Sequence, residues 1–202
     1  MLGTMTTEQP WSWPETRADG QPIAGGQVLI HFTMSLDGFV ADTEGNLDWA
    51  FGFGGPSAAA VQAIIASIGA ALAGRRGYDQ GMMRGAKLYG GAWSGPQFVL
   101  THRPAEPPAD PSVTFLHGSL REAVATARAA AGGKYVVVVG ASIARQCLAE
   151  GLADEILLHL VPVVLGDGIR LFGGPLPRPV ALRPVSVGRS GDVTDLRFSV
   201  IR

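Results

Sequence analysis

Short apolar runs separated by glycine and proline dominate the pattern of this chain. The clearest run, Tyr-Val-Val-Val-Val at 135–139, has the length and the β-branched composition of a buried strand. Other apolar runs predict further strands, at 28–34, 70–73, 98–101, 113–116 and 154–165, the last of them interrupted or edged at Pro162. Two late runs, 180–187 and 194–201, flank a Gly-Arg-Ser-Gly-Asp turn, which is typical of an antiparallel hairpin.

Several segments between these runs have helical character. Ser57 can cap a helix over 57–68, and the apolar stripe of this helix consists of Val61, Ile64, Ile65 and Ile68. A second helix is predicted to follow the turn at 74–76, and a third at about 120–131. A fourth follows the run at 135–139, with Ser142 as its candidate cap, and Gly151 ends it.

In chain order the predicted elements are strand, helix, strand, helix, strand, strand, helix, strand, helix and three strands. This alternation predicts an α/β fold in three layers, with a mostly parallel central sheet, helices on both faces and a C-terminal antiparallel hairpin. Residues 1–26 lack periodicity and are predicted to form a flexible extension, which leaves one domain over 27–202.

Composition narrows the function classes. The net charge of −1 provides no general attraction for nucleic acid or a membrane surface, so we expect neither as a partner. The single cysteine excludes an internal disulfide and a zinc-deaminase site, and we expect no metal. The chain has neither a run of about 18 apolar residues nor a signal-like start, so a cytoplasmic location is expected. The hydrolase motif G-x-S-x-G is also absent.

Polar or glycine-rich groups follow three of the predicted strands. They are Gly74-Arg75-Arg76, Thr101-His102-Arg103 and Gly140-Ala141-Ser142-Ile143. Ligands bind beyond the carboxyl ends of strands in open parallel sheets, so these groups are expected on one rim. Paired arginines can clamp phosphate, and free N–H groups at a helix start favour it. Each group alone could be a plain turn, and the full G-x-G-x-x-G dinucleotide pattern is absent.

The end of the first strand carries a fourth candidate. Asp37 belongs to the turn Ser-Leu-Asp-Gly at 35–38, and most aspartates in such turns only hold the turn. Because this turn lies on the same rim, Asp37 is also a candidate to act on substrate. His31 is expected to be a satisfied core or edge histidine, and we assign no role to His117 or His159.

Taken in order, these motifs resemble a known family. They are Met34-Ser-Leu-Asp-Gly-Phe-Val-Ala41, Asn46-Leu-Asp-Trp49, Gly74-Arg-Arg-Gly-Tyr-Asp79, Gly151-Leu-Ala-Asp-Glu-Ile-Leu157, Pro162-Val-Val-Leu-Gly-Asp-Gly168 and Leu171-Phe172. The family includes the reductase domain of the bifunctional riboflavin-biosynthesis deaminase-reductase and its stand-alone relatives, and it shares its fold with dihydrofolate reductase. The resemblance covers about 28–201.

The resemblance implies a dihydrofolate-reductase-like fold, bound NADPH and hydride transfer to a small heterocyclic, imine or carbonyl substrate. The residues implied for the cofactor are Gly74, Arg75 and Arg76 at its phosphates, Thr101, His102 and Arg103 at the adenosine ribose and 2′-phosphate, and Gly140, Ala141, Ser142 and Ile143 under the pyrophosphate. Asp37 is implied as the catalytic residue, which would orient the substrate or relay a proton, and Ser35 and Trp49 are implied beside the substrate. Family members are usually homodimers paired through their late strands, so a homodimer is expected.

The sequence also departs from the family's pattern. Gly77 replaces the motif threonine, and Val139 replaces the first glycine of the usual pair, which weakens the expected cofactor contacts. The helix at 57–68 has no Asp or Glu, whereas dihydrofolate reductases carry their pterin-binding acid there. Dihydrofolate is therefore a poor candidate substrate. A nucleotide-binding protein without turnover, and a protein that uses the fold only for dimerisation, remain alternatives.

Overall fold

The computed structural model describes residues 26–83, 85–103, 108 and 110–202. The extension predicted at 1–26 therefore lies outside the described residues, apart from Gly26. The strands are β1 (Val28–Ser35), β2 (Phe39–Ala41), β3 (Ile68–Gly74), β4 (Gln97–Leu100), β5 (Val113–Leu116), β6 (Tyr135–Val139), β7 (Glu155–Val161), β8 (Ile169–Arg170), β9 (Leu182–Ser190) and β10 (Val193–Val200). The helices are α1 (Ala58–Ser67), α2 (Arg75–Met83), α3 (Leu120–Ala130) and α4 (Ala141–Ala149), with 3₁₀ turns η1 (Asp48–Ala50) and η2 (Leu88–Gly91).

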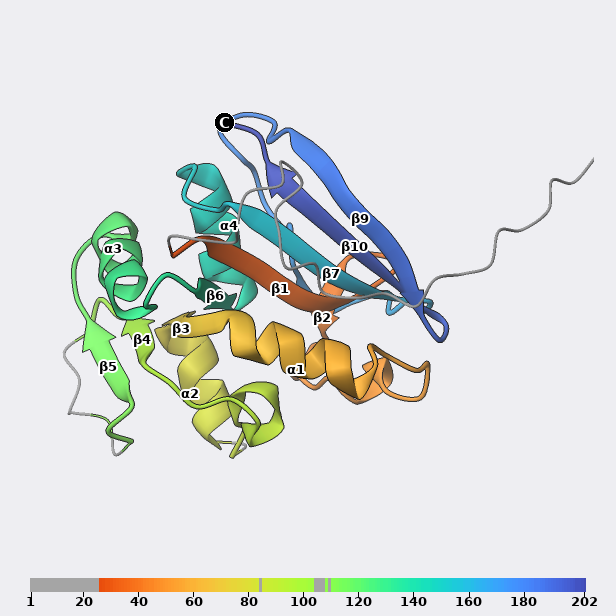
Figure 1. Cartoon of the computed structure of the whole chain (residues 1–202), viewed down its shortest axis with the longest axis horizontal. Coiled ribbons are helices and arrows are strands. Elements are labelled where there is room, and N and C mark those ends of the chain that lie inside the picture. Colours follow the sequence, from red (N-terminus) through yellow and green to blue (C-terminus); the bar gives the residue numbers. More distant parts are fainter. Residues whose placement is uncertain (1–25, 84, 104–107, 109) are drawn as a thin grey trace, which may run out of the picture.

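The main sheet has eight strands in the order β5-β4-β3-β6-β1-β7-β10-β9 (Figure 1). The strands from β5 to β7 run parallel, and β10 and β9 extend the sheet as an antiparallel hairpin. This arrangement confirms the predicted fold class and the predicted order of the main elements. The patterning missed β2 and β8, which form a separate small sheet and have only three and two residues, too few to show a period.

Strand β6 lies inside the sheet and is covered on both faces. Val136 and Val138 belong to the core on the side of α3 and α4, whereas Tyr135 and Val137 belong to the core beneath α1. Figure 1 shows α1 and α2 on one side of the sheet and α3 and α4 on the other. A parallel strand covered on both faces is apolar at nearly every position, which explains the uninterrupted valine run.

Helix starts follow local backbone chemistry. Ser57 caps α1 as predicted, because its hydroxyl accepts a hydrogen bond from the N–H of Ala60 at 3.2 Å. The prediction that Ser142 caps α4 is wrong. Gly140 adopts a φ of +95°, which brings the chain into the helix already at Ala141.

Within the described ranges, every helix is too short or too polar to cross a membrane.

Two strand ends differ from the prediction by three residues or more. β7 ends at Val161 instead of residue 165, because Pro162 has no N–H to continue the ladder. β9 continues to Ser190, because residues 188–190 pair with β10 and leave only residues 191 and 192 in the turn. A glycine within a strand pattern is only weak evidence for the end of the strand, and here the pairing with β10 determines where β9 ends.

Candidate functional site

The carboxyl ends of the parallel strands meet along one edge of the sheet, called here the carboxyl edge. Strands β4, β3 and β6 are neighbours, so residues 101–103, 74–76 and 140–143 follow one another along this edge. β1 adjoins β6 and adds the turn at 35–38. The structure thus brings together the segments that the sequence singled out, while their binding roles stay predictions.

The start of α4 is open. A Cβ placed on Gly140 would meet no atom within 4 Å, and no side chain caps the first turn of α4. Ile143 is buried in the core, and a Cβ on Gly74 would lie 3.1 Å from its side chain. Gly74 therefore lets α4 pack closely against the end of β3. Ala141 and Ser142 are left to offer backbone N–H groups at the positive end of the helix dipole.

The cations and polar side chains beside this helix start differ in their contacts. Arg75 Nε donates to Asp79 Oδ1 at 2.6 Å, and its guanidinium stacks 4.7 Å from the ring centre of Phe115. Thr101 is buried, and its hydroxyl accepts a hydrogen bond from the N–H of Arg103 at 3.2 Å, so it holds the local turn. The exposed cations at this edge are Arg76 and Arg103, the second of which lies 3.9 Å from the carboxylate of Asp79, and the exposed imidazole of His102 lies beside them.

Asp37 fastens a loop to the end of β1. Its carboxylate accepts hydrogen bonds from Ser35 Oγ at 2.7 Å and from the N–H groups of Leu165 and Gly166 at 3.0 and 2.7 Å. These bonds, above all the one from Ser35, lower the pKa of Asp37 to about 2. Such a carboxylate holds the loop at 162–168 and is poorly suited to relay protons near neutral pH. A direct role towards substrate stays a prediction.

The other two residues predicted for the substrate lie close in the chain to Asp37 or pack beside β1. Ser35 is buried, and its hydroxyl accepts a hydrogen bond from the N–H of Phe39 at 2.9 Å, so it couples Asp37 to the next strand. Trp49 lies in η1, which packs against β1, and its indole N–H donates to the carbonyl of Asn46 at 3.2 Å. Both residues therefore have local structural partners.

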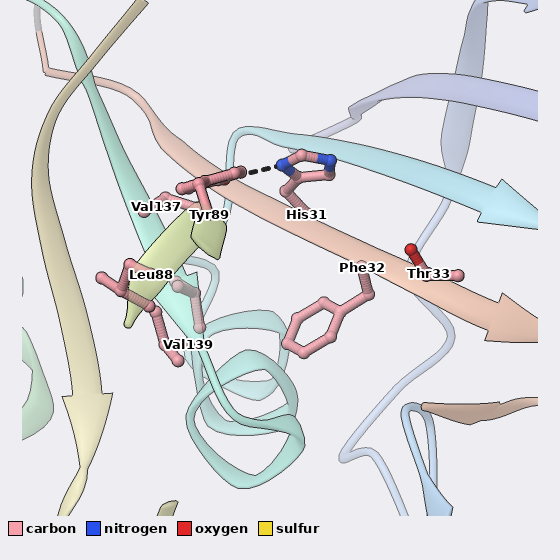
Figure 2. A pocket seen from close by; sticks show the side chains of 8 residues that line it. His31, Phe32, Thr33, Leu88, Tyr89, Val137 and Val139 are labelled. Carbon is pink, nitrogen blue, oxygen red and sulfur yellow. Dashed lines mark hydrogen bonds between the residues drawn. The ribbon is translucent and has the colours of Figure 1, made fainter. Parts of the chain in front are cut away.

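A cavity of about 200 Å³ lies on the α1 side of the sheet, between β1, β6 and η2. It is lined by His31, Phe32, Thr33, Leu88, Tyr89, Val137, Val138 and Val139 (Figure 2). Cavities of about 150 Å³ hold a benzene ring, so this one has room for a single ring. The segment bearing η2 is fastened to the sheet by Trp93, which is buried and donates its indole N–H to the carbonyl of Ile68 at 3.1 Å.

A chain of hydrogen-bonded side chains, called here the polar chain, borders this cavity. Tyr89 Oη lies 2.8 Å from His31 Nδ1, and His31 Nε2 lies 2.9 Å from His159 Nε2. His159 Nδ1 bonds to one oxygen of Asp195, whose other oxygen accepts a hydrogen bond from Ser190. Burial, and then the neighbouring His159, lower the pKa of His31 to about 3, so its ring is neutral near pH 7.

Sequence reasoning missed the polar chain. His31 was correctly expected to be a satisfied histidine, but His159 and Asp195 received no role. His31 and His159 each interrupt an otherwise apolar strand, and that interruption is a sign in the sequence, whereas Asp195 lies in a strand of mixed polar and apolar residues and gives no such sign. Across the described residues, no group of three or more His, Cys, Asp or Glu side chains is arranged to hold a metal ion.

Comparison with known proteins identifies relatives along nearly the whole chain. The chain is 26% identical over 175 residues to the uncharacterized protein YwjB of Bacillus subtilis, which covers 85% of this chain and 97% of YwjB. Its structure is similar to that of a putative riboflavin biosynthesis protein from Shewanella sp. PV-4, with a TM-score of 0.76, 25% identity, and coverage of 87% of this chain and 99% of that one.

More distant structural similarity extends to a dihydrofolate reductase. The enzyme from Enterococcus faecalis, solved as a complex with NADP(H), has a TM-score of 0.58 and 15% identity, and the match covers 89% of this chain and 99% of that one. At this identity the match shows the fold alone, which is the expected dihydrofolate-reductase-like α/β fold. The model of the RibD C-terminal domain matches residues 27–194. Because that match spans most of the sequence, the chain belongs to the RibD C-terminal domain family.

Proposed function

We propose that this protein is an NADPH-dependent reductase that transfers hydride to a small heterocyclic, imine or carbonyl substrate. The family and the fold are those of reductases. The observation that carries the finer proposal is the adjacency of two features at the end of β6. Val139 lines the ring-sized cavity, and the next residue, Gly140, opens the uncapped start of α4. A cofactor bound along the carboxyl edge would thus end beside the cavity.

The carboxyl edge fits the phosphates of NADPH. The open helix start at 140–142 offers N–H groups to a pyrophosphate. Arg76, His102 and Arg103 are exposed and offer charge-assisted hydrogen bonds to a further phosphate, such as that on the 2′ position. Arg75 is already engaged by Asp79, so its contribution is to shape the turn. When bound, the cofactor supplies the hydride, and the protein orients substrate and excludes water.

The cavity favours a small flat substrate. Leu88, Val137 and Val139 provide apolar walls, whereas His31 and Tyr89 provide polar groups on one side. α1 contains no Asp or Glu, so it offers no carboxylate to pair with a pterin ring. The proposed activity is therefore related to that of 5-amino-6-(5-phosphoribosylamino)uracil reductase of riboflavin biosynthesis rather than to that of dihydrofolate reductase.

Calorimetric titration with NADPH and NADH tests the cofactor proposal. We expect NADPH to bind more tightly, because the exposed cations match its additional phosphate. Arg76→Ala should weaken NADPH by about ten- to a hundred-fold, the loss expected for one charge-assisted contact, and should affect NADH less. Arg183→Ala is the matched control, because Arg183 is also exposed but lies near the opposite edge of the sheet. Equal affinity of the unaltered protein for both cofactors would contradict the proposal.

Turnover is tested separately. NADPH oxidation is followed in the presence of imines, pterins, quinones and aminouracils. If the protein is a reductase, it should accelerate the oxidation of NADPH with at least one of these classes. Tight NADPH binding without oxidation in any of them would favour the nucleotide-binding alternative. Failure to bind either cofactor would favour the alternative in which the fold serves only for assembly.

A further inference from the structure

The polar chain starts at the cavity wall, where Tyr89 and His31 lie, and continues across the neighbouring strands away from the cavity. Its members come from η2, β1, β7 and β10, which are a covering segment and three adjacent strands. Figure 2 shows Tyr89 and His31 directed towards each other at the cavity wall. From His31 the chain continues through His159 to Asp195, which is fully buried. One end thus opens on the proposed substrate space, and the other end holds a buried carboxylate.

Hydrogen-bond donors and acceptors along the chain allow only two arrangements. The carboxylate of Asp195 can only accept, so the Nδ1 of His159 carries a hydrogen. When His159 is neutral, its Nε2 accepts from the Nε2–H of His31, and the Nδ1 of His31 accepts from the hydroxyl of Tyr89. When His159 is protonated, its Nε2–H donates to His31, which then carries its hydrogen on Nδ1 and donates to the oxygen of Tyr89.

The second arrangement turns the Tyr89 hydroxyl hydrogen towards the cavity. We propose that Tyr89 donates the proton that the substrate heteroatom needs on reduction, and that His31, His159 and Asp195 relay a replacement proton to it. This inference rests on the proposed function for the hydride, and it names Tyr89 as the proton donor of the same site.

The proton and electron balance closes within these groups. Hydride forms a bond to the electrophilic carbon, and the electron pair of the C=N or C=O bond moves to the heteroatom. The heteroatom takes the hydroxyl proton of Tyr89, whose oxygen takes the Nδ1 proton of His31. The Nε2 of His31 takes the Nε2 proton of His159, which becomes a neutral imidazole, while Asp195 keeps its negative charge. Solvent later restores the proton on His159.

The surroundings suit this relay. The low pKa of His31 keeps its ring uncharged, so it passes a proton by exchanging one tautomer for the other. Burial raises the pKa of Tyr89, so its hydroxyl is protonated at neutral pH. The carboxyl group of Asp195 is hydrogen-bonded to His159 and Ser190, and a paired buried carboxylate is much less costly than an isolated one.

The backbone of Tyr89 adds an independent indication of function. Tyr89 has a φ of +52° and is the one non-glycine residue with a positive φ among those that the structure describes. A left-handed tyrosine costs about 1–2 kcal/mol, and such strain clusters at functional sites. Trp93 and the apolar contact of Leu88 hold the segment in place against this strain.

The charged groups beside the polar chain form their own network. On the same face of the sheet, Arg197 donates to Glu155 Oε2 at 2.6 Å, and Tyr135 donates to the same oxygen at 3.0 Å. These groups come from β10, β7 and β6, the last of which also lines the cavity. Because Arg197, Glu155 and Tyr135 are bonded to one another, they take no part in the relay. In the relay His159 changes its charge, and the carboxylate of Asp195 lies opposite it.

Nitrogen-15 NMR of the histidine rings, recorded on the whole protein without cofactor, tests the relay without any substrate. As pH is lowered, we expect His159 to gain a proton and His31 to move its hydrogen from Nε2 to Nδ1 in the same step, while His31 stays neutral. His31 keeping one tautomer while His159 charges would overturn the relay. So would a His159 that takes up no proton while the protein stays folded.

Replacement of Tyr89 tests the donor. Tyr89→Phe keeps the ring and removes the hydroxyl, so NADPH affinity should change by less than about twofold while turnover falls by ~10²–10⁴. Tyr78→Phe is the matched control, because Tyr78 packs edge-on against Phe115 and lies outside the polar chain. Full turnover in Tyr89→Phe would refute the donor role.

The two kinds of failure are distinguishable. If the unaltered protein fails to oxidise NADPH with any of the substrate classes tested, the proposed function is wrong. The histidine tautomers measured by NMR still decide whether the relay exists. Asp195→Asn provides a further readout, because the relay needs the protonated form of His159: loss of the neighbouring negative charge should move the alkaline limb of the kcat profile to lower pH and leave KM nearly unchanged. If that variant does not fold, Ser190→Ala, which removes one hydrogen bond to the same carboxylate, should move the limb in the opposite direction.

Discussion

At the scale of single residues, Asp37 illustrates how a motif acid can serve the fold. The carboxylate accepts three hydrogen bonds that join the end of β1 to the loop at 162–168. Asparagine has one oxygen and one NH₂ group, so it cannot accept from all of these donors. Asp37→Asn should therefore lower the melting temperature and loosen the loop, while NADPH affinity stays unchanged.

The pH dependence of this effect has a defined sign. The pKa of Asp37 in the folded protein is about 2, below the value of about 3.9 expected for the unfolded chain. The stabilisation from its ionised form is complete above the unfolded pKa and is lost as pH falls from about 4 to about 2. The difference in melting temperature between the unaltered protein and Asp37→Asn should shrink across this window. Asp192→Asn, in the exposed hairpin turn, is the control and should show no such trend.

The same substitution separates the two roles considered for Asp37. If the carboxylate only positions the loop, turnover in Asp37→Asn should recover when glycerol or another osmolyte stabilises the fold. A turnover loss of ~10²–10⁴ that persists in a fully folded variant would favour a direct role towards substrate.

At the scale of the elements, the two ends of α4 provide a matched pair of glycines. Gly140 has a φ of +95° before the helix, and Gly151 has a φ of +67° after it, and a Cβ on either would meet no atom within 4 Å. Alanine at either position should destabilise the fold by about 1–3 kcal/mol through backbone strain alone. Only Gly140→Ala should also weaken NADPH, because its methyl group would occupy the open space proposed for the pyrophosphate.

Denaturant unfolding and calorimetry of both variants test this expectation. NADPH affinity that falls equally in Gly140→Ala and Gly151→Ala would indicate that loss of stability, rather than occupation of the site, weakens binding. Unchanged affinity in Gly140→Ala would contradict the assignment of the helix start.

The elements also show how far the sequence predicts this structure. The valine run of β6 and the apolar stripe of α1 are local patterns; β6 lies where the sequence placed it, and α1 differs only at its end, because Ile68 of the predicted stripe begins β3. The groups on the carboxyl edge follow from the rule that parallel strands end together. The polar chain could not be predicted in this way, because His31 and His159 are far apart in sequence and meet only through the pairing of β1 with β7. Tyr89 lies in a glycine-rich segment without period, so no local pattern predicted its position over the sheet.

At the scale of the whole molecule, the late strands bear on assembly. The apolar residues of β7, such as Ile156 and Leu158, are buried within one chain because β7 lies between β1 and β10. The available edge is instead β9, where Val187 is 67% exposed and Leu182 is 38% exposed. An exposed edge strand with apolar side chains favours pairing with another copy.

We therefore expect a homodimer of about twice the 21.0 kDa mass of one chain in sedimentation experiments. Val187→Lys should shift the protein towards the monomer, because a charged residue blocks edge pairing. Phe51→Lys is the control, since Phe51 is 73% exposed but lies outside β9. A species with the mass of one chain at micromolar concentration would contradict the dimer.

The attachment of η2 has a consequence for how this architecture could diversify. Trp93 fastens the segment between α2 and β4 to the sheet through the carbonyl of Ile68, and this hydrogen bond does not involve the side chains at 88 and 89 that line the cavity. The cavity-lining side chains of this segment can therefore change while its attachment through Trp93 is kept. Changes at Leu88 would reshape the space offered to a substrate without disturbing the helix start of α4 or the packed strands. Natural selection or protein engineering could therefore change the substrate preference through substitutions in the segment between α2 and β4, while the rest of the sequence stays the same.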